Sequence, residues 1–319
     1  MNDSDRAALA ECRQTEKELI KLAREEVTRA LASLPETITP KGINNYVLVS
    51  DSHIGCSSAL CHPDGFLRDE GGIYKPSLDQ LAVYEKWIEF WYDWVPRVTE
   101  GEPYAIVNIG DSIDGVHHGS VTQISHNLES QRLHAIKVWE PIVEMAAAYY
   151  HIRGTEAHVG KSSQEEEAIA KALGALPDKA GRHARYELWF RIGDDDRGGL
   201  GHAMHHIGCT GSSHYESSAV MREVTEAFVE AGRWGDEPPR LIARGHRHRH
   251  IKIQIPGGKG DVIGMTTPAW QLKTPFTSKI AGGRLSQPQI GGCVARYHGG
   301  ELYIRSRTWR GERAQAVGE

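Results

Sequence analysis

From Leu241 to His248 the chain reads LIARGHRH. The apolar run Leu241-Ile242-Ala243 has the composition of a buried strand, and Gly245 allows the backbone to turn directly after it. His246 and His248 follow in this turn, where imidazoles two positions apart can reach two neighbouring metal ions. A chain with 17 histidines can produce such a pair by chance, so the stretch needs support from elsewhere in the sequence.

Three other short apolar runs also lead into Asp or His. In an open α/β sheet, binding sites form at the carboxyl ends of the strands, so we expect these residues to converge with the histidines of the first stretch. The residues are Asp51 and His53 after the run 46–50, Asp111 after the run 105–109, and His205 and His206 after the run 203–204. Side chains two positions apart in an extended segment share a face, so Asp51 and His53 can hold one ion.

The segment after the second run adds further polar side chains. The carboxylate of Asp111 can bridge two metals, and Asp114 can orient a metal ligand by a hydrogen bond from behind it. His117 and His118 follow in the next loop. They either contact the substrate or lie solvated on the surface, and the sequence leaves both readings open.

Composition limits the class of protein. The chain has 319 residues, of which 39% are hydrophobic and 25% charged, as in ordinary globular domains. Its formal charge of −5 is not the basic footprint of a protein that wraps duplex DNA. The N-terminus lacks the apolar region of a signal peptide, and no apolar run is long enough to span a membrane. Five scattered cysteines favour a reducing compartment. We therefore expect a cytoplasmic protein without membrane contact.

The pattern of apolar residues predicts two parts. Residues 1–44 comprise an amphipathic helix over 4–34 and a linker, and residues 45–319 form the main domain. The helix either packs on the domain or mediates homo-oligomerisation. An aromatic-rich helix over 78–95 is expected to end at Pro96 and to bury its aromatic stripe in the core. The other predicted helices are 128–147, 163–175 and 216–232, and the predicted strands are 46–50, 104–109, 149–153, 185–192, 199–204, 240–243, 250–255, 261–266, 290–298 and 301–308.

The ordered motifs together resemble those of the calcineurin-like metallophosphoesterase superfamily, and especially the phosphoesterases of bacteriophages. These motifs are Asp-x-His, Gly-Asp-x-x-Asp, Gly-Thr-Glu-x-His, a His at a strand end, and Gly-His-x-His, and they cover about residues 45–250. The resemblance implies an α/β fold, namely a four-layer α/β/β/α sandwich after the N-terminal helix, with two metal ions at the strand ends. It also implies the ligand set: Asp51, His53 and His248 for the first metal, Asp111 as the bridge, and His205 or His206 with His246 for the second.

One stretch departs from the superfamily pattern of Gly-Asn-His-Asp or Gly-Asn-His-Glu. Gly154 is followed here by Thr155 and Glu156, and a histidine comes only at His158. We expect Glu156 to replace the metal-binding Asn, and His158 to protonate the leaving group. A register that places Thr155 at the metal as well is the alternative.

The mixed Asp and His ligands suit manganese best, with iron or zinc as alternatives. Two such ions would clamp a phosphate ester and acidify an attacking water, while Arg247 or Arg153 would neutralise charge on the phosphoryl oxygens. We expect a phosphodiesterase or nuclease. A phosphomonoesterase and a non-catalytic metal-binding scaffold remain alternatives.

The expected substrate class depends on four basic residues in and around the stretch of His246 and His248. They are Arg244, Arg247, Arg249 and Lys252. They form either a groove for a nucleotide or single-stranded nucleic acid, or a solvated surface.

Overall fold

The computed structural model describes residues 43–117, 119–193, 195, 198–208, 213–279 and 286–311. The helix expected over residues 4–34 and His118 lie outside these ranges. The described part is a mixed α/β protein with two large sheets and a short two-stranded one, as the sequence predicts.

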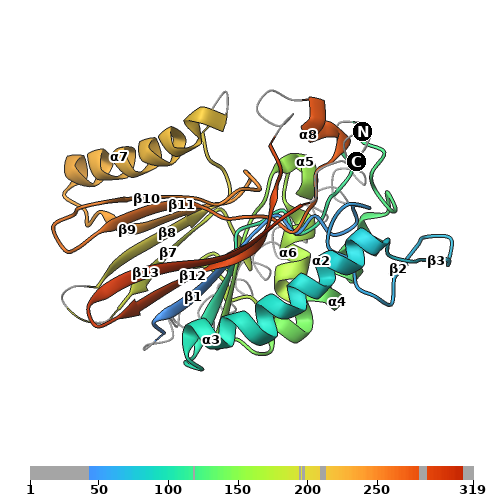
Figure 1. The fold of residues 1–319 in the computed structure, drawn as a ribbon, viewed down its shortest axis with the longest axis horizontal. Helices are drawn as coiled ribbons and strands as arrows, with labels where there is room; N and C mark the ends of the chain where they lie inside the picture. The colour runs from blue at the N-terminus through green and yellow to red at the C-terminus, as the bar shows by residue number, and fades with distance from the viewer. Residues whose placement is uncertain are drawn as a thin grey trace, which may run out of the picture.

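The larger sheet contains the first predicted strand at its centre. Its six strands run in the order β13-β12-β1-β4-β5-β6, and the pairs β1–β4, β4–β5 and β5–β6 are parallel (Figure 1). Parallel pairing brings the carboxyl ends of these strands to one edge of the sheet. The bounds are β1 Asn45–Val49, β4 Tyr104–Asn108, β5 Ala148–Ile152, β6 Ala184–Arg185, β12 Gln289–His298 and β13 Glu301–Arg310.

The second sheet carries the remaining histidine motifs. Its five strands have the order β10-β11-β9-β8-β7, with β8–β9 and β9–β11 parallel. The carboxyl ends of β8 and β9 therefore also lie at one edge. The bounds are β7 Glu187–Ile192, β8 Gly199–Met204, β9 Pro239–Arg244, β10 Ile251–Ile255 and β11 Val262–Thr266, and the small sheet pairs β2 Phe66–Leu67 with β3 Ile73–Tyr74.

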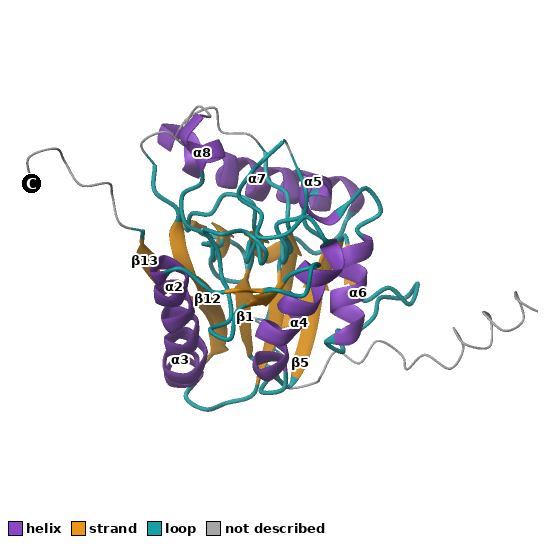
Figure 2. Ribbon diagram, turned by 90° about the vertical axis from the view of Figure 1, so that its right-hand side faces the viewer, coloured by secondary structure: helices purple, strands orange, loops and turns teal. Residues whose placement is uncertain are grey.

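Helices cover the outer face of each sheet. In Figure 2, α2, α3, α4 and α6 stand in front of the six-stranded sheet, and Figure 1 shows α7 along the far side of the five-stranded one. Their bounds are α2 Leu78–Glu89, α3 Val95–Thr99, α4 Leu128–Val143, α5 Glu156–Val159, α6 Gln164–Ala172, α7 Glu216–Trp234 and α8 Pro275–Lys279, with a 3-10 turn at Ser213–Tyr215. No helix in the described ranges is both long and apolar enough to cross a bilayer.

The prediction that Pro96 ends the aromatic-rich helix is wrong. A π-helical segment, Phe90–Trp94, follows α2, and α3 then begins at Val95 with Pro96 in its first turn. The backbone N–H of Val95 donates to the Phe90 carbonyl five residues earlier, so the hydrogen-bond register shifts just before Pro96, which has no N–H to donate. The helical stretch therefore continues to Thr99.

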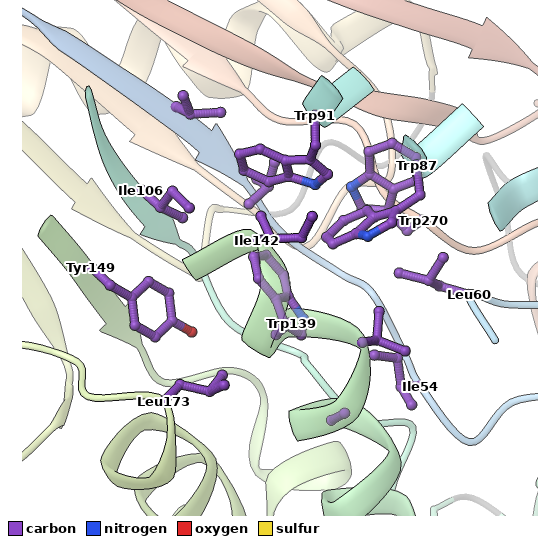
Figure 3. Packing of buried hydrophobic residues seen from close by; sticks show 14 of the residues in the cluster. Ile54, Leu60, Trp87, Trp91, Ile106, Trp139, Ile142, Tyr149, Leu173 and Trp270 are labelled. Atoms are coloured by element: carbon purple, nitrogen blue, oxygen red, sulfur yellow. The ribbon is translucent and has the colours of Figure 1, made fainter. Parts of the chain in front are cut away.

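The aromatic stripe of this helix lies in the core, as predicted. Trp87 and Trp91 are almost fully buried, and they pack with Trp139 of α4 and with Trp270 (Figure 3). The ring centroids of Trp87 lie 4.9 Å from those of Trp139 and 4.8 Å from those of Trp270, in edge-to-face geometry. The backbone N–H of Trp270 donates to the carbonyl oxygen of Asp51 (2.9 Å), so the aromatic cluster directly supports the first motif.

A second apolar cluster fills the space between the two sheets. Leu48 of β1 and Val107 of β4 meet Phe190 of β7 and Leu241 of β9 there. The neighbouring Val47 of β1 instead belongs to the cluster beneath the helices. Because β1 is buried on both faces, it reads as a continuous apolar run and not as an alternating pattern.

A candidate binuclear metal centre

The predicted site residues lie on loops that leave the carboxyl ends of strands in both sheets. Backbone hydrogen bonds tie these loops together: the N–H of Asp51 donates to the Gly110 carbonyl (2.9 Å), and that of His53 to the Asp111 carbonyl (3.0 Å). The N–H of Gly245 donates to the His205 carbonyl (3.0 Å) within the second sheet. Within each sheet, neighbouring loops at this edge are therefore joined by backbone hydrogen bonds.

The backbone of this edge has an unusual conformation. Seven described residues other than glycine have a positive φ, and five of them are predicted metal ligands. These are Asp51 (56°), His53 (42°), Asp111 (54°), His246 (70°) and His248 (54°). Such conformations cost of order 1–3 kcal/mol each for residues with a side chain, and they concentrate at functional sites. The backbone conformation of these loops therefore sets the orientation of these five side chains.

The first group consists of Asp51, His53 and His248. The two Nε2 atoms of the histidines lie 3.1 Å apart, and Asp51 Oδ1 lies 3.3 Å from that of His248 and 3.8 Å from that of His53. Asp51 is fully buried, and its Oδ1 accepts no hydrogen bond from any described residue. A buried carboxylate oxygen without a donor fits a metal ligand, because a cation would supply the missing positive charge.

The second group consists of Asp111, His205 and His246. Nδ1 of the fully buried His205 lies 2.6 Å from the Ile109 carbonyl oxygen, so this nitrogen carries the proton and donates it. The other ring nitrogen, Nε2, then faces Asp111 Oδ2 at 3.0 Å. A histidine held in this tautomer by a backbone carbonyl is the usual arrangement of a metal-binding imidazole.

The two groups are joined directly. The backbone N–H of His246 donates to Asp51 Oδ2 at 3.0 Å, which links a residue of the second group to the central carboxylate of the first. His53, Asp111 and His158 form a further set of side chains close enough to share an ion. The geometry therefore places Asp111 between both groups, where a bridging carboxylate is expected.

His158 lies at the edge of both groups. Its Nδ1 is 2.7 Å from the backbone carbonyl oxygen of Asp114, and its ring centroid is 4.5 Å from that of His53 and 4.3 Å from that of His117. Its Nε2 is 4.0 Å from Asp111 Oδ2. The nitrogen that does not face the carbonyl is therefore the one closest to the bridging position.

Asp114 supports these histidines from behind. Its Oδ1 lies 3.5 Å from His53 Nδ1, and its Oδ2 lies 3.6 Å from His117 Nε2. Gln123 donates to Oδ2 (2.7 Å), and Gln271 donates to Oδ1 (3.3 Å). The Asp114 carboxylate therefore lies beside the imidazole of His53, whose Nδ1 makes no hydrogen bond to any described residue.

Charges at the site are strongly coupled in the absence of a cation. Burial opposes a charge on His53, but the carboxylates of Asp114 and Asp51 outweigh it and raise the pKa of His53 to about 10. Burial likewise opposes a charge on His205, yet Asp111 raises its pKa to about 9. Protons on two histidines thus balance the carboxylates. Metal ions would displace these protons, since a histidine binds metal in its neutral form.

Two predicted metal ligands lie away from the groups. Glu156 is exposed and belongs to none of the potential ligand sets found among the described residues. His206 is also exposed, and its ring centroid is 5.3 Å from that of His205. Of the two neighbouring histidines, the structure therefore places His205 in the group and His206 at its rim.

Thr155 occupies the position that was expected for Glu156. Its hydroxyl is 3.2 Å from Asp111 Oδ2, 3.2 Å from His205 Nε2 and 3.3 Å from His246 Nδ1. Its backbone N–H donates to Asp111 Oδ1 at 2.6 Å. Helix α5 begins at Glu156, which turns that side chain outward. The structure places Thr155 at the centre, as in the alternative register, but Glu156, which that register also brings to the site, is exposed.

The predicted arginines lie near the site but are engaged elsewhere. Arg153 Nε donates to the Ala184 carbonyl (2.8 Å), and its guanidinium lies 4.4 Å from the ring centroid of Tyr186. Arg247 Nη2 donates to the Gly208 carbonyl (3.0 Å), and its buried Nε has no hydrogen-bond partner among the described residues. Arg247 Nε therefore has no acceptor among the described residues, whereas Arg153 is directed toward the neighbouring strand.

Half of the basic residues that could form a groove are paired with carboxylates. Arg244 is buried, and its Nε donates to Glu223 of α7 (2.9 Å). Arg249 Nε lies 3.1 Å from a carboxylate oxygen of Glu216, at the start of the same helix. Two of the four positive charges are thus paired with carboxylates, which were too distant in the sequence to be recognised as partners.

No family model matches the chain, and no curated protein matches it. Similar solved structures include an NMR structure of a Thermotoga maritima protein (11% identity, 84% of this chain and 100% of that chain, TM-score 0.34). Two others are a Vps29 double mutant from Entamoeba histolytica (9%, 83% and 99%, 0.35) and vacuolar protein sorting 29 from Cryptosporidium parvum (10%, 84% and 98%, 0.32).

Proposed function

We propose that this protein is a metallophosphoesterase that uses two divalent cations, preferably manganese, to hydrolyse a phosphodiester in a nucleotide or single-stranded nucleic acid. The observation that carries the proposal is the pair of linked Asp/His groups around Asp51 and Asp111, with a buried Asp51 oxygen that lacks a donor. Mixed carboxylate and imidazole ligands without thiolates suit Mn²⁺, Fe or Zn²⁺ better than Mg²⁺.

The layer order supports the fold that this activity would use. Helix α7 packs on the five-stranded sheet, the two sheets share the apolar cluster of Leu48 and Phe190, and α2 and α4 pack on the outer face of the six-stranded sheet. This succession supports the proposal of a four-layer α/β/β/α sandwich, which the resemblance of the motifs implies.

The side chains have different roles at the proposed metal centre. Asp51, His53 and His248 would hold one cation, His205 and His246 the other, and Asp111 would bind both. Two cations held in this way polarise phosphoryl oxygens and lower the pKa of an attacking water. Thr155 fixes the bridging carboxylate through its N–H and hydroxyl.

His158 is placed for proton exchange at this centre. Its Nδ1 donates to the Asp114 carbonyl, which leaves Nε2 directed toward the bridging position. Burial lowers the pKa of His158 to about 4, so the ring is neutral at pH 7 and accepts a hydrogen bond through Nε2. Nε2 can take a proton from the attacking water and then give it to the leaving oxygen of the ester, which returns the ring to its neutral form.

Anion recognition would come from the rim of the site. Arg247 stands between the two histidines of its loop and retains its Nε donor for a phosphoryl oxygen. His117 and the exposed His206 flank the centre and can contact the rest of the substrate.

The experiment that tests the proposal compares metal content and hydrolysis in the same preparations. Protein stripped of metal and reconstituted with Mn²⁺ should bind close to two ions per chain and should hydrolyse bis-p-nitrophenyl phosphate and single-stranded DNA faster than p-nitrophenyl phosphate. Preference for p-nitrophenyl phosphate would make the protein a phosphomonoesterase. Two bound ions without turnover on any ester would make it a metal-binding scaffold.

A further inference from the structure

Glu166 of α6 is a fully buried carboxyl group that the proposed reaction does not use. Its Oε1 accepts the backbone N–H of Ser112 (2.9 Å), and its Oε2 accepts the Ser112 hydroxyl (3.2 Å). Oε2 also contacts Nε2 of His151, which is equally buried. A buried carboxyl group is costly unless its hydrogen bonds are satisfied, and here both oxygens have partners.

These contacts join the loop that carries Asp111 to the strand that leads to Thr155. Ser112 directly follows Asp111 at the end of β4, while His151 lies on β5, whose continuation carries Thr155. The Glu166 side chain thus spans the carboxyl ends of two adjacent parallel strands.

The loops after β4 and β5 approach each other so closely that neither can move toward the other without a clash. A Cβ added to Gly110 would lie 2.6 Å from the backbone nitrogen of Gly154, and one added to Gly154 would lie 2.1 Å from Asp111 Oδ1. Only glycines fit at both positions. A small shift of either loop would therefore move Asp111 away from Thr155.

A buried polar network holds Glu166 in place. The Tyr149 hydroxyl lies 2.6 Å from His151 Nδ1, and Asn108 donates to the Ser112 hydroxyl (3.0 Å). Burial raises the pKa of Glu166 to about 8 and lowers that of His151 to about 3. The pair is therefore held as a neutral unit that shares one proton.

From this arrangement we infer that Glu166 is a positioning residue for the metal centre: it ties the loop after β4 to strand β5, which leads to Thr155, so that Asp111 is presented to both cations. The inference rests on the proposed function for the identity of the ligands it positions. It assigns to Glu166 no contact with metal or substrate. Groups that orient metal ligands in this indirect way typically contribute about 10- to 100-fold to metal affinity or activity.

The adjacent Glu167 provides a matched control on the same helix. Its two carboxylate oxygens accept the backbone N–H groups of His183 (2.9 Å) and Ala184 (2.8 Å), at the start of β6. Like Glu166, it is a helix glutamate that satisfies loop amides, but it does not touch the loop of Asp111. Glu167→Ala therefore reproduces the general cost of losing such contacts without disturbing the bridging carboxylate.

The test compares Glu166→Ala, Glu166→Gln and Glu167→Ala in the full chain by two readouts that need no hydrolysis. The first is hydrogen exchange of metal-free protein in the segment 109–114. The second is Mn²⁺ affinity, with the electron paramagnetic resonance spectrum of exchange-coupled Mn²⁺ pairs. Glu166→Ala should speed exchange in that segment, weaken Mn²⁺ binding about 10- to 100-fold and reduce the coupled signal. Glu166→Gln keeps the size of the side chain and the Ser112 contacts. It should restore most of the protection from exchange and most of the Mn²⁺ affinity.

Unchanged exchange in Glu166→Ala, or equal losses of metal affinity in Glu166→Ala and Glu167→Ala, would overturn the inference. If Glu166→Ala does not fold, Glu166→Asp replaces it. This variant is one methylene too short to reach both Ser112 and His151, and it should show the same two changes. A wild-type protein that binds no Mn²⁺ would refute the proposed function alone, because the exchange experiment would still decide the role of Glu166.

Discussion

Replacing Thr155 by valine removes one hydroxyl from the centre of the site and leaves the shape of the side chain almost unchanged. The lost group lies within 3.3 Å of a carboxylate oxygen and two imidazole nitrogens. The backbone N–H of residue 155 would still donate to Asp111 Oδ1, so the loop should remain in place. A hydrogen bond to a charged group contributes about 1.5–3 kcal/mol, which corresponds to about a 10- to 150-fold change in an equilibrium.

We therefore expect Thr155→Val to weaken binding of the cation near His205 and His246 by about 10- to 150-fold. Isothermal titration of metal-free protein with Mn²⁺ measures this loss, and excess Mn²⁺ should restore part of the hydrolysis of bis-p-nitrophenyl phosphate. The matched control is Glu156→Gln, which changes the neighbouring exposed side chain and should leave affinity within about twofold, as for most surface substitutions.

A larger loss of Mn²⁺ affinity in Glu156→Gln than in Thr155→Val would refute this reasoning. If Glu156→Gln lost the affinity and Thr155→Val did not, the carboxylate of Glu156 would be the ligand, as the resemblance to the superfamily first implies. Equal and small effects would mean that neither residue contributes to cation binding at this position.

Three further outcomes are expected. Asp111→Asn should abolish hydrolysis with little change in circular dichroism, because an amide cannot supply a negative oxygen to two cations; turnover near the wild-type level would contradict the bridging role. His158→Ala should keep both metals and lose about a hundred- to ten-thousandfold in rate on a nucleoside leaving group, and less on p-nitrophenolate, which needs little protonation; equal losses on both would exclude proton transfer. His134 accepts the His62 N–H through Nε2 (3.1 Å), and burial lowers its pKa to about 4. Since the unfolded chain takes up this proton near pH 6.5, the contribution of His134 to stability should be lost as pH falls from about 6.5 to 4, by at most about 3 kcal/mol. Urea denaturation of metal-free His134→Gln should show a weaker dependence on pH over this range, and an identical dependence would exclude the assignment.

The convergence of the candidate metal ligands could be predicted because it depends on local signals. An apolar run followed by Asp or His marks a strand end, and parallel pairing of β1, β4 and β5 brings such ends together without further information. The bounds of most strands follow from the same runs. The buried aromatic stripe of α2 is predictable for a similar reason, since its period matches that of a helix.

The features that were missed depend on contacts between distant segments. Whether Thr155 or Glu156 faces the centre is decided by a hydrogen bond to Asp111, which lies 44 positions away in the sequence. Arg244 was expected at the surface because its partner Glu223 lies on a separate helix. The helix continues past Pro96 because a π-helical segment shifts the register, and composition alone does not reveal such a shift.

The shape of the site has a cost that the rest of the fold must offset. Five ligands adopt left-handed backbone conformations, and Asp51 buries an oxygen without a donor. Conformations of this kind cost of order 1–3 kcal/mol each, a large share of the 5–15 kcal/mol that stabilises a typical domain. Two features support the loops from below: the Trp270 N–H holds the Asp51 carbonyl from the aromatic core, and Glu166 holds Ser112 from α6. Backbone strain and a buried carboxylate oxygen without a donor are thus concentrated at the edge where cations would bind. The packing that stabilises this edge lies directly beneath it.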